Sequence, residues 1–178
     1  MTDLTLTPRK PGAAHPGAAK VIAAAKRSAF ANRGTWAEDK VREALKRWEQ
    51  TREGREANRL LDTRAAMRIV KAAPADFEFF CVAAGMTLHG LIEVKSTQHD
   101  TRLAHDKVPQ MPRLIHRARA GGQCAVLVCH ASTKLWRVAT LDWLIANRVG
   151  ASWDLSSLNT HANAAHALHA WQPLVFTF

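Results

Sequence analysis

The tripeptide Glu93-Val94-Lys95 is the segment whose residue types and spacing most directly suggest chemistry. It closes an apolar run over residues 87–94 that is typical of a β-strand. Successive side chains of a strand point to opposite faces, so Glu93 and Lys95 project on the same side. Because burying one such charge alone costs several kcal/mol, each of them needs a counter-charge, a metal ion or water.

Asp76 lies 17 residues before Glu93, at the start of the preceding apolar run, residues 77–82. The short segment 83–85, which contains a glycine, indicates a hairpin turn between the two runs. A hairpin would return the Asp76 carboxylate to Glu93. Two carboxylates and one lysine suit metal-assisted hydrolysis of a phosphodiester, in which carboxylate oxygens hold Mg²⁺, or Mn²⁺ in its place, and the lysine stabilises developing negative charge.

Glu38 is a further acidic candidate, on a predicted helix where it shares a face with Val41 and Leu45. An acidic side chain on the core side of a helix is unusual without a partner. Thr35 and Glu38 also have the spacing of a capping box, so the glutamate could serve the helix end, the site or both. The plainer interpretation of Glu93 and Lys95 is an ion pair at a strand edge, since acidic-x-lysine tripeptides are common.

The remaining periodic segments predict the elements that must position these residues. Helical spacing or helix-capping residues indicate helices over 35–59, 109–119, 141–148 and 163–170. Apolar runs indicate strands over 77–82, 87–94, 125–129 and 135–139, with an edge strand over 174–178. The polar segment 97–107 is expected to be a loop. This order predicts an α/β domain, a mixed sheet flanked by helices.

The charge distribution favours a polyanionic partner. The net charge is +10, and residues 1–72 carry 16 Lys and Arg against 8 Asp and Glu, a local net of +8. We expect residues 1–33 to be a mobile basic arm, 34–150 the catalytic domain and 151–178 a C-terminal extension that packs on the domain or on a dimer partner. Three cysteines, with neither a signal peptide nor a membrane-spanning run, predict a cytoplasmic protein.

Basic side chains in two segments are the candidates for contacts with a nucleic-acid backbone. They are Arg64, Arg68, Lys71, Arg113 and Arg117. A pI near 10.3 supports a nucleic-acid partner. The alternative for these residues is an ordinary solvated face.

Two motifs together resemble a known superfamily of nucleases. Pro-Ala-Asp at 74–76 followed by Ile-Glu-Val-Lys at 92–95 resembles the PD-(D/E)xK nucleases, and more narrowly the RecU-type Holliday junction resolvases. Arg-Gly-Thr-Trp-Ala-Glu at 33–38, and the order of Gln110, an apolar residue and a double glycine at 121–122, are similar to that family as well. The resemblance covers about residues 33–145.

This resemblance implies a restriction-endonuclease-like fold, a homodimer, and paired nicks across a four-way DNA junction in a Mg²⁺-dependent reaction. Asp76 and Glu93 would bind the metal together with the backbone carbonyl of Val94, and Lys95 would position the nucleophile. Glu38 would be a metal ligand or lie just outside the ligand shell, and Gln110 would be a supporting residue.

Two other functions remain open from the sequence. One is a PD-(D/E)xK nuclease that acts on linear, nicked or flap DNA. The other is a DNA-binding protein that has the same fold and does not cleave.

Overall fold

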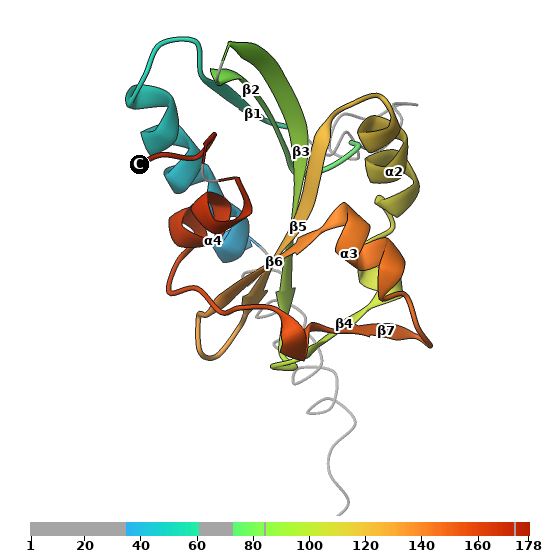
Figure 1. Cartoon of the computed structure of the whole chain (residues 1–178). Helices are drawn as coiled ribbons and strands as arrows, with labels where there is room; N and C mark the ends of the chain where they lie inside the picture. The colour runs from blue at the N-terminus through green and yellow to red at the C-terminus, as the bar shows by residue number, and fades with distance from the viewer. Residues whose placement is uncertain (1–34, 61–72, 84, 173) are drawn as a thin grey trace, which may run out of the picture. The chain divides into compact units, whose positions relative to one another are not determined.

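The computed structural model describes residues 35–60, 73–83, 85–172 and 174–178, and its centre is a five-stranded mixed sheet (Figure 1). The strand order is β1 (Glu56–Arg59), β2 (Phe77–Ala83), β3 (Met86–Thr97), β5 (Gln123–His130) and β6 (Trp136–Thr140). The β3–β5 pair is parallel and the other pairs are antiparallel. A second, two-stranded sheet joins β4 (Arg102–Ala104) to β7 (Ser152–Asp154).

Helices cover both faces of the sheet, as Figure 1 shows. The helix over residues 35–50 and α4 (Ala164–Trp171) lie on one face, where Trp48, Phe79 and Phe176 are packed together. The other face carries α2 (Met111–Arg119) and α3 (Leu141–Ala146). The predicted α/β architecture, with a mixed sheet flanked by helices, is therefore confirmed. Among the described residues, no helix is both long enough and apolar enough to cross a membrane.

The alternation along β3 decides which face of the sheet each of its side chains occupies. Ile92 and Val94 belong to the core on the side of α4, whereas Leu91 belongs to the core beneath α2 and α3. Glu93 lies two residues from Leu91 and therefore faces the same side as Leu91. The strand thus places an acidic side chain within an otherwise apolar interior.

The predicted hairpin of β2 and β3 is confirmed, with Phe77 opposite Ile92 and Gly85 in the turn at φ 76°. The predicted strands near 125–129 and 135–139 form β5 and β6, and Thr140 caps α3 by accepting a hydrogen bond from Trp143. The helix predicted over 109–119 begins at Met111. The one predicted over 163–170 is α4.

The helix predicted over 35–59 is too long, because the helix ends at residue 50. Gly54 then adopts φ 76°, a left-handed conformation that a helix does not contain, and the chain turns. Residues 56–59 form β1 as an edge strand beside β2, since pairing with β2 satisfies their backbone groups.

Two further predictions were wrong in the regions of β4 and the C-terminus. The loop predicted over 97–107 contains β4 and the 3-10 helix η2 (His105–Lys107), because β7 pairs with β4. The predicted edge strand over 174–178 does not form. Val175 and Phe176 instead enter the core, and the Trp48 indole N–H donates a hydrogen bond of 2.7 Å to the Val175 carbonyl.

Several described residues after 150 pack into the interior of this domain. β7 and the 3-10 helix η3 (Leu155–Ser157) place Trp153 and Leu155 in the core beneath α2 and α3. Leu168 of α4 lies in the core on the opposite face. The arm predicted over 1–33 lies outside the described residues.

Candidate active site

Asp76 lies beside the middle of β3. It immediately precedes β2, and because Phe77 pairs with Ile92, the register sets Asp76 next to Glu93. The Asp76 Oδ2 atom accepts a hydrogen bond of 2.7 Å from the backbone N–H of Val94. The Asp76 carbonyl accepts a further bond of 2.8 Å from Leu60 at the end of β1. The proximity of Asp76 to the Glu93–Lys95 pair, which the hairpin predicted, is therefore present.

Glu93 is fully buried and forms an ion pair through Oε1 with the Lys95 ammonium, whose side chain is 21% exposed. Beyond this ion pair, neither carboxylate oxygen of Glu93 has a hydrogen-bond partner among the described residues. A buried carboxylate with so few partners is costly, because desolvation is not repaid by hydrogen bonds. The pair therefore differs from a surface ion pair at a strand edge.

The pKa values of both acids are raised, chiefly by burial. Burial, reinforced by the neighbouring Asp76 carboxylate, raises the pKa of Glu93 to about 7, although Lys95 opposes the shift. Burial also raises the pKa of Asp76, while Lys95 and the Val94 N–H act against it. Two acids compete for one lysine, and a further cation at this place would stabilise both in the charged form.

The two carboxylates of Asp76 and Glu93 fit Mg²⁺ better than they fit a metal ion that needs three or four protein side chains. Among the described residues, no group of three or more His, Cys, Asp and Glu side chains is placed to hold a metal ion. Mg²⁺ is commonly held by only one or two carboxylates, with water and phosphate completing its shell. Asp76 and Glu93 supply two, and among the described residues the Glu93 oxygens have no hydrogen-bond partner beyond Lys95.

The Val94 carbonyl is placed to add a third oxygen. The N–H and C=O of one strand residue point to the same neighbour, and the Val94 N–H faces Asp76. The Val94 carbonyl therefore points to the same side of β3 as the Val94 N–H. Val94 lies past the end of the pairing with β2, whose first residue is Phe77. The roles of these three groups as metal ligands stay predictions.

Glu38 lies at the edge of this cluster. Its Oε2 atom accepts a hydrogen bond of 2.5 Å from Arg59 on β1, and its charge contributes to raising the pKa of both Asp76 and Glu93. The capping-box interpretation of Thr35 and Glu38 stays a prediction. A carboxylate that is committed to an arginine is better suited to tune the site than to bind its metal.

Gln110 stands apart from the carboxylates. It precedes α2 at the N-cap position and its side chain makes no capping hydrogen bond. Its Oε1 atom is buried without a hydrogen-bond partner in the described part of the chain. No hydrogen bond or ion pair between described residues joins it to Asp76, Glu93 or Lys95. Its supporting role stays a prediction.

Of the candidate DNA-binding residues, Arg113 and Arg117 lie on α2, where both are partly exposed and line a groove beside β3. Arg64, Arg68 and Lys71 lie outside the described residues.

Arg59 was missed by the sequence analysis because it falls in the segment predicted to be helical. On β1 it pairs with Glu38, and it opposes the rise in the pKa of Asp76. The turn-forming glycine at 54 was the signal that could have separated β1 from the helix.

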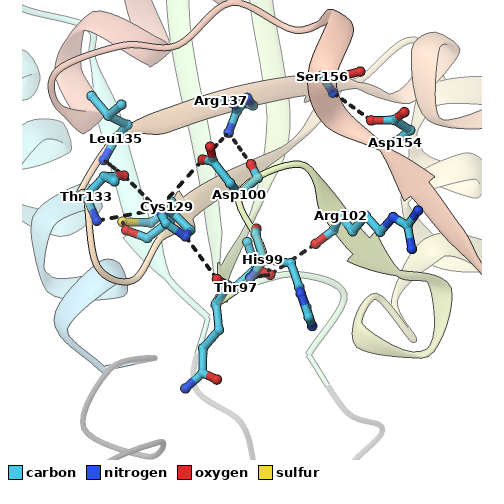
Figure 2. A network of polar contacts seen from close by, with 12 residues as sticks. Thr97, His99, Asp100, Arg102, Cys129, Thr133, Leu135, Arg137, Asp154 and Ser156 are labelled. Carbon is cyan, nitrogen blue, oxygen red and sulfur yellow. Dashed lines mark hydrogen bonds and ion pairs between the residues drawn. The ribbon is translucent and has the colours of Figure 1, made fainter.

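A polar network at the far end of the strands was missed as well (Figure 2). The Arg137 NH1 atom donates a hydrogen bond of 2.5 Å to the Asp100 carbonyl and lies 3.6 Å from the Asp100 carboxylate. His130 lies 3.7 Å from the same carboxylate. Its Nε2 atom is 3.0 Å from the Gln98 carbonyl, and its Nδ1 atom is 2.7 Å from the Thr133 hydroxyl.

The strand pattern did contain a signal for this network. Arg137 alternates with Trp136 and Val138 and so faces the side on which Ala139 is buried. A buried arginine in a short strand requires acceptors from another segment. The sequence did not show that the loop after β3 supplies them.

Comparisons with known proteins find similarity among solved structures. No protein-family model matches the sequence, and no curated protein matches it. Among solved structures, the chain is similar to Hjc, a Holliday junction resolvase from the archaeal hyperthermophile Archaeoglobus fulgidus. The TM-score is 0.43 and the identity 20%, over 70% of this chain and 84% of that chain.

Proposed function

We propose that this protein is a Mg²⁺-dependent endonuclease that cuts branched DNA, with four-way junctions as its substrate. The observation that carries the proposal is the meeting of Asp76, Glu93 and Lys95 at one buried point of the sheet, where negative charge exceeds positive charge. The net charge of +10 makes the rest of the chain attractive to a polyanion.

Each group of the site has a distinct task in such a reaction. Asp76, Glu93 and the Val94 carbonyl would hold the ion, and Glu38, paired with Arg59, would set the charge around them. A bound Mg²⁺ supplies Lewis-acid stabilisation of the phosphate and lowers the pKa of a bound water. Lys95, at the exposed margin of the cluster, places a positive charge where a scissile phosphate would approach and can orient the attacking water.

The preference for four-way junctions rests on the motif resemblance and is the finer part of the proposal. Two nicks placed across a junction require two active sites, so we propose a homodimer that takes part in DNA recombination and repair. Binding should depend mainly on phosphate contacts, and the affinity should therefore fall steeply as salt is raised.

The test is cleavage of a four-way junction and of a linear duplex of the same sequence, each with Mg²⁺, with Mn²⁺ and with EDTA. The proposal expects metal-dependent paired nicks in the junction and little cleavage of the duplex. Equal cleavage of both would assign the protein to nucleases of linear, nicked or flap DNA. Binding without cleavage under either metal would favour a non-catalytic DNA-binding protein.

A further inference from the structure

A groove of about 460 Å³ opens between α2 and the sheet. Its apolar wall is formed by Pro74, Leu91, Pro112 and Ala120. Its polar rim comes from one face of α2, at Arg113, His116 and Arg117. None of the described residues that line it is acidic. A concave, apolar site with a few charged groups at its rim is typical of a place where a ligand binds.

The position of the groove ties it to the candidate active site. Pro74 precedes Asp76 by two residues, and Leu91 precedes Glu93 by two residues on the same face of β3. Two residues of a strand span roughly 7 Å. A DNA strand whose phosphate lies at Glu93 and Lys95 would therefore have its neighbouring nucleotide at the groove.

Arg117 is held in place at the rim. Its aliphatic stem packs on Gly122, where an added Cβ would lie 2.7 Å from the Arg117 Cγ atom and 3.1 Å from its carbonyl oxygen. Any larger residue at 122 would displace the side chain or the end of α2. A guanidinium fixed in this way loses less freedom when it binds a phosphate.

We propose that this groove binds one unpaired nucleotide of the DNA strand adjacent to the cleavage point, with its base on the apolar wall and its phosphates at Arg113 and Arg117. The inference rests on the proposed function and narrows its substrate. A stacked base pair presents no free face to an apolar surface, whereas an unpaired base does, and bases taken out of the stack are held between apolar side chains. Basic side chains beside such a surface are the usual design for single-stranded nucleic acid.

The experiment measures affinity by fluorescence anisotropy in EDTA, where no cleavage occurs. The probes are a fully paired four-way junction and the same junction with two unpaired nucleotides in one strand at its centre. We expect wild-type protein to bind the second probe about ten-fold more tightly, which corresponds to about 1.4 kcal/mol, within the range for stacking of one base. Equal affinities for the two probes would overturn the proposal.

Two variants and a control locate the effect. Arg117→Gln removes the rim charge, and Gly122→Ala displaces the same side chain without changing charge; both should bring the preference to within two-fold of unity. Arg119→Gln removes the same charge from an exposed position of α2 outside the groove and should weaken binding to both probes equally. A preference kept by Arg117→Gln, or lost equally in Arg119→Gln, would contradict the assignment, and thermal unfolding of each variant verifies that it is folded.

The two proposals can fail separately. Wild-type protein that prefers the unpaired probe but never cleaves with Mg²⁺ or Mn²⁺ would support the groove and refute the nuclease. Metal-dependent cleavage without any preference between the probes would refute the groove alone.

Discussion

Two regions on the same face of the sheet bury charged side chains, and they do so in opposite ways. The first, the carboxylate cluster, consists of Asp76, Glu93 and Lys95. The second, the strand-end network, consists of Asp100, His130 and Arg137; Asp100 and Arg137 are labelled in Figure 2. Lys95 and Arg137 lie on one line across the strands, because each is in register with Val128 of β5.

The two regions differ in how far their charges are balanced. In the strand-end network Arg137 has a carbonyl and a carboxylate near its NH1 atom, and Asp100 is 64% exposed, so water shares its charge. In the carboxylate cluster two acids share one lysine, and Glu93 is fully buried. The Arg137 Nε atom is buried without a hydrogen-bond partner among the described residues, but the guanidinium charge is matched by the Asp100 carboxylate. A site prepared for a cation keeps an excess of negative charge, at a cost that the cation offsets when it binds.

The largest expected difference between the regions is in DNA cleavage. Glu93→Gln and Asp76→Asn should each lower the single-turnover rate by roughly a thousand-fold or more, since each removes a charged metal ligand. Arg137→Gln should change the rate of folded protein by less than about ten-fold, because no hydrogen bond or ion pair between described residues joins Arg137 to the cluster. A Glu93→Gln protein that cuts at close to the wild-type rate would contradict the assignment of the carboxylate cluster, rather than the strand-end network, as the active site.

The next effect is the dependence of stability on pH in the absence of divalent cations. Because burial raises the pKa of Glu93 to about 7, the folded state holds this proton more tightly than the unfolded chain. The stabilisation is fully present below pH 4.5 and is lost as the pH rises to about 7, by up to about 3 kcal/mol in the free energy of unfolding. Asp76, whose pKa is also raised, acts in the same direction.

Urea unfolding between pH 4.5 and 8 measures this loss. The free energy of unfolding of Glu93→Gln should rise relative to that of wild type as the pH rises, because the Gln amide is neutral at every pH and is not ionised inside the protein. A difference that stays constant over this range would mean that Glu93 is stabilised as an anion without metal.

Arg137→Gln is expected to have a smaller effect, and on stability alone. The change removes the hydrogen bond to the Asp100 carbonyl and a charge beside the Asp100 carboxylate, which should cost about 1–3 kcal/mol in the free energy of unfolding. Asp100→Asn, which keeps the backbone acceptor and alters an exposed side chain, should cost less than about 1 kcal/mol. Denaturant unfolding of both variants would show whether the carbonyl is the main partner; equal losses would contradict it.

The same contrast explains how much the sequence could predict. Glu93, Lys95 and Asp76 were found because strand alternation and a short hairpin are local rules, and local rules fixed their geometry. The Arg137 network depends on a loop that reaches β6 from 37 residues away along the chain, and no local pattern describes such a closure. Arg59 was missed for a related reason, since β1 exists only through its pairing with β2.

The fold shows the same division. The hairpin, the strand pair β5–β6 and helix α4 follow from periodicity and turn residues. The conformation of the C-terminal segment could not be predicted in this way, because a short apolar run can form an edge strand or fill a gap in the core. The Trp48 indole and its bond to the Val175 carbonyl select the second outcome.

The most direct test of the central claim is the location of Mn²⁺ in crystals of the wild-type protein, from anomalous diffraction. The account predicts one strong peak bound by the carboxylates of Asp76 and Glu93 and by the Val94 carbonyl, with the Lys95 ammonium moved off Glu93, and no peak in crystals of Glu93→Gln. Crystals with Mn²⁺ absent from this place, and the Lys95–Glu93 ion pair intact, would contradict it.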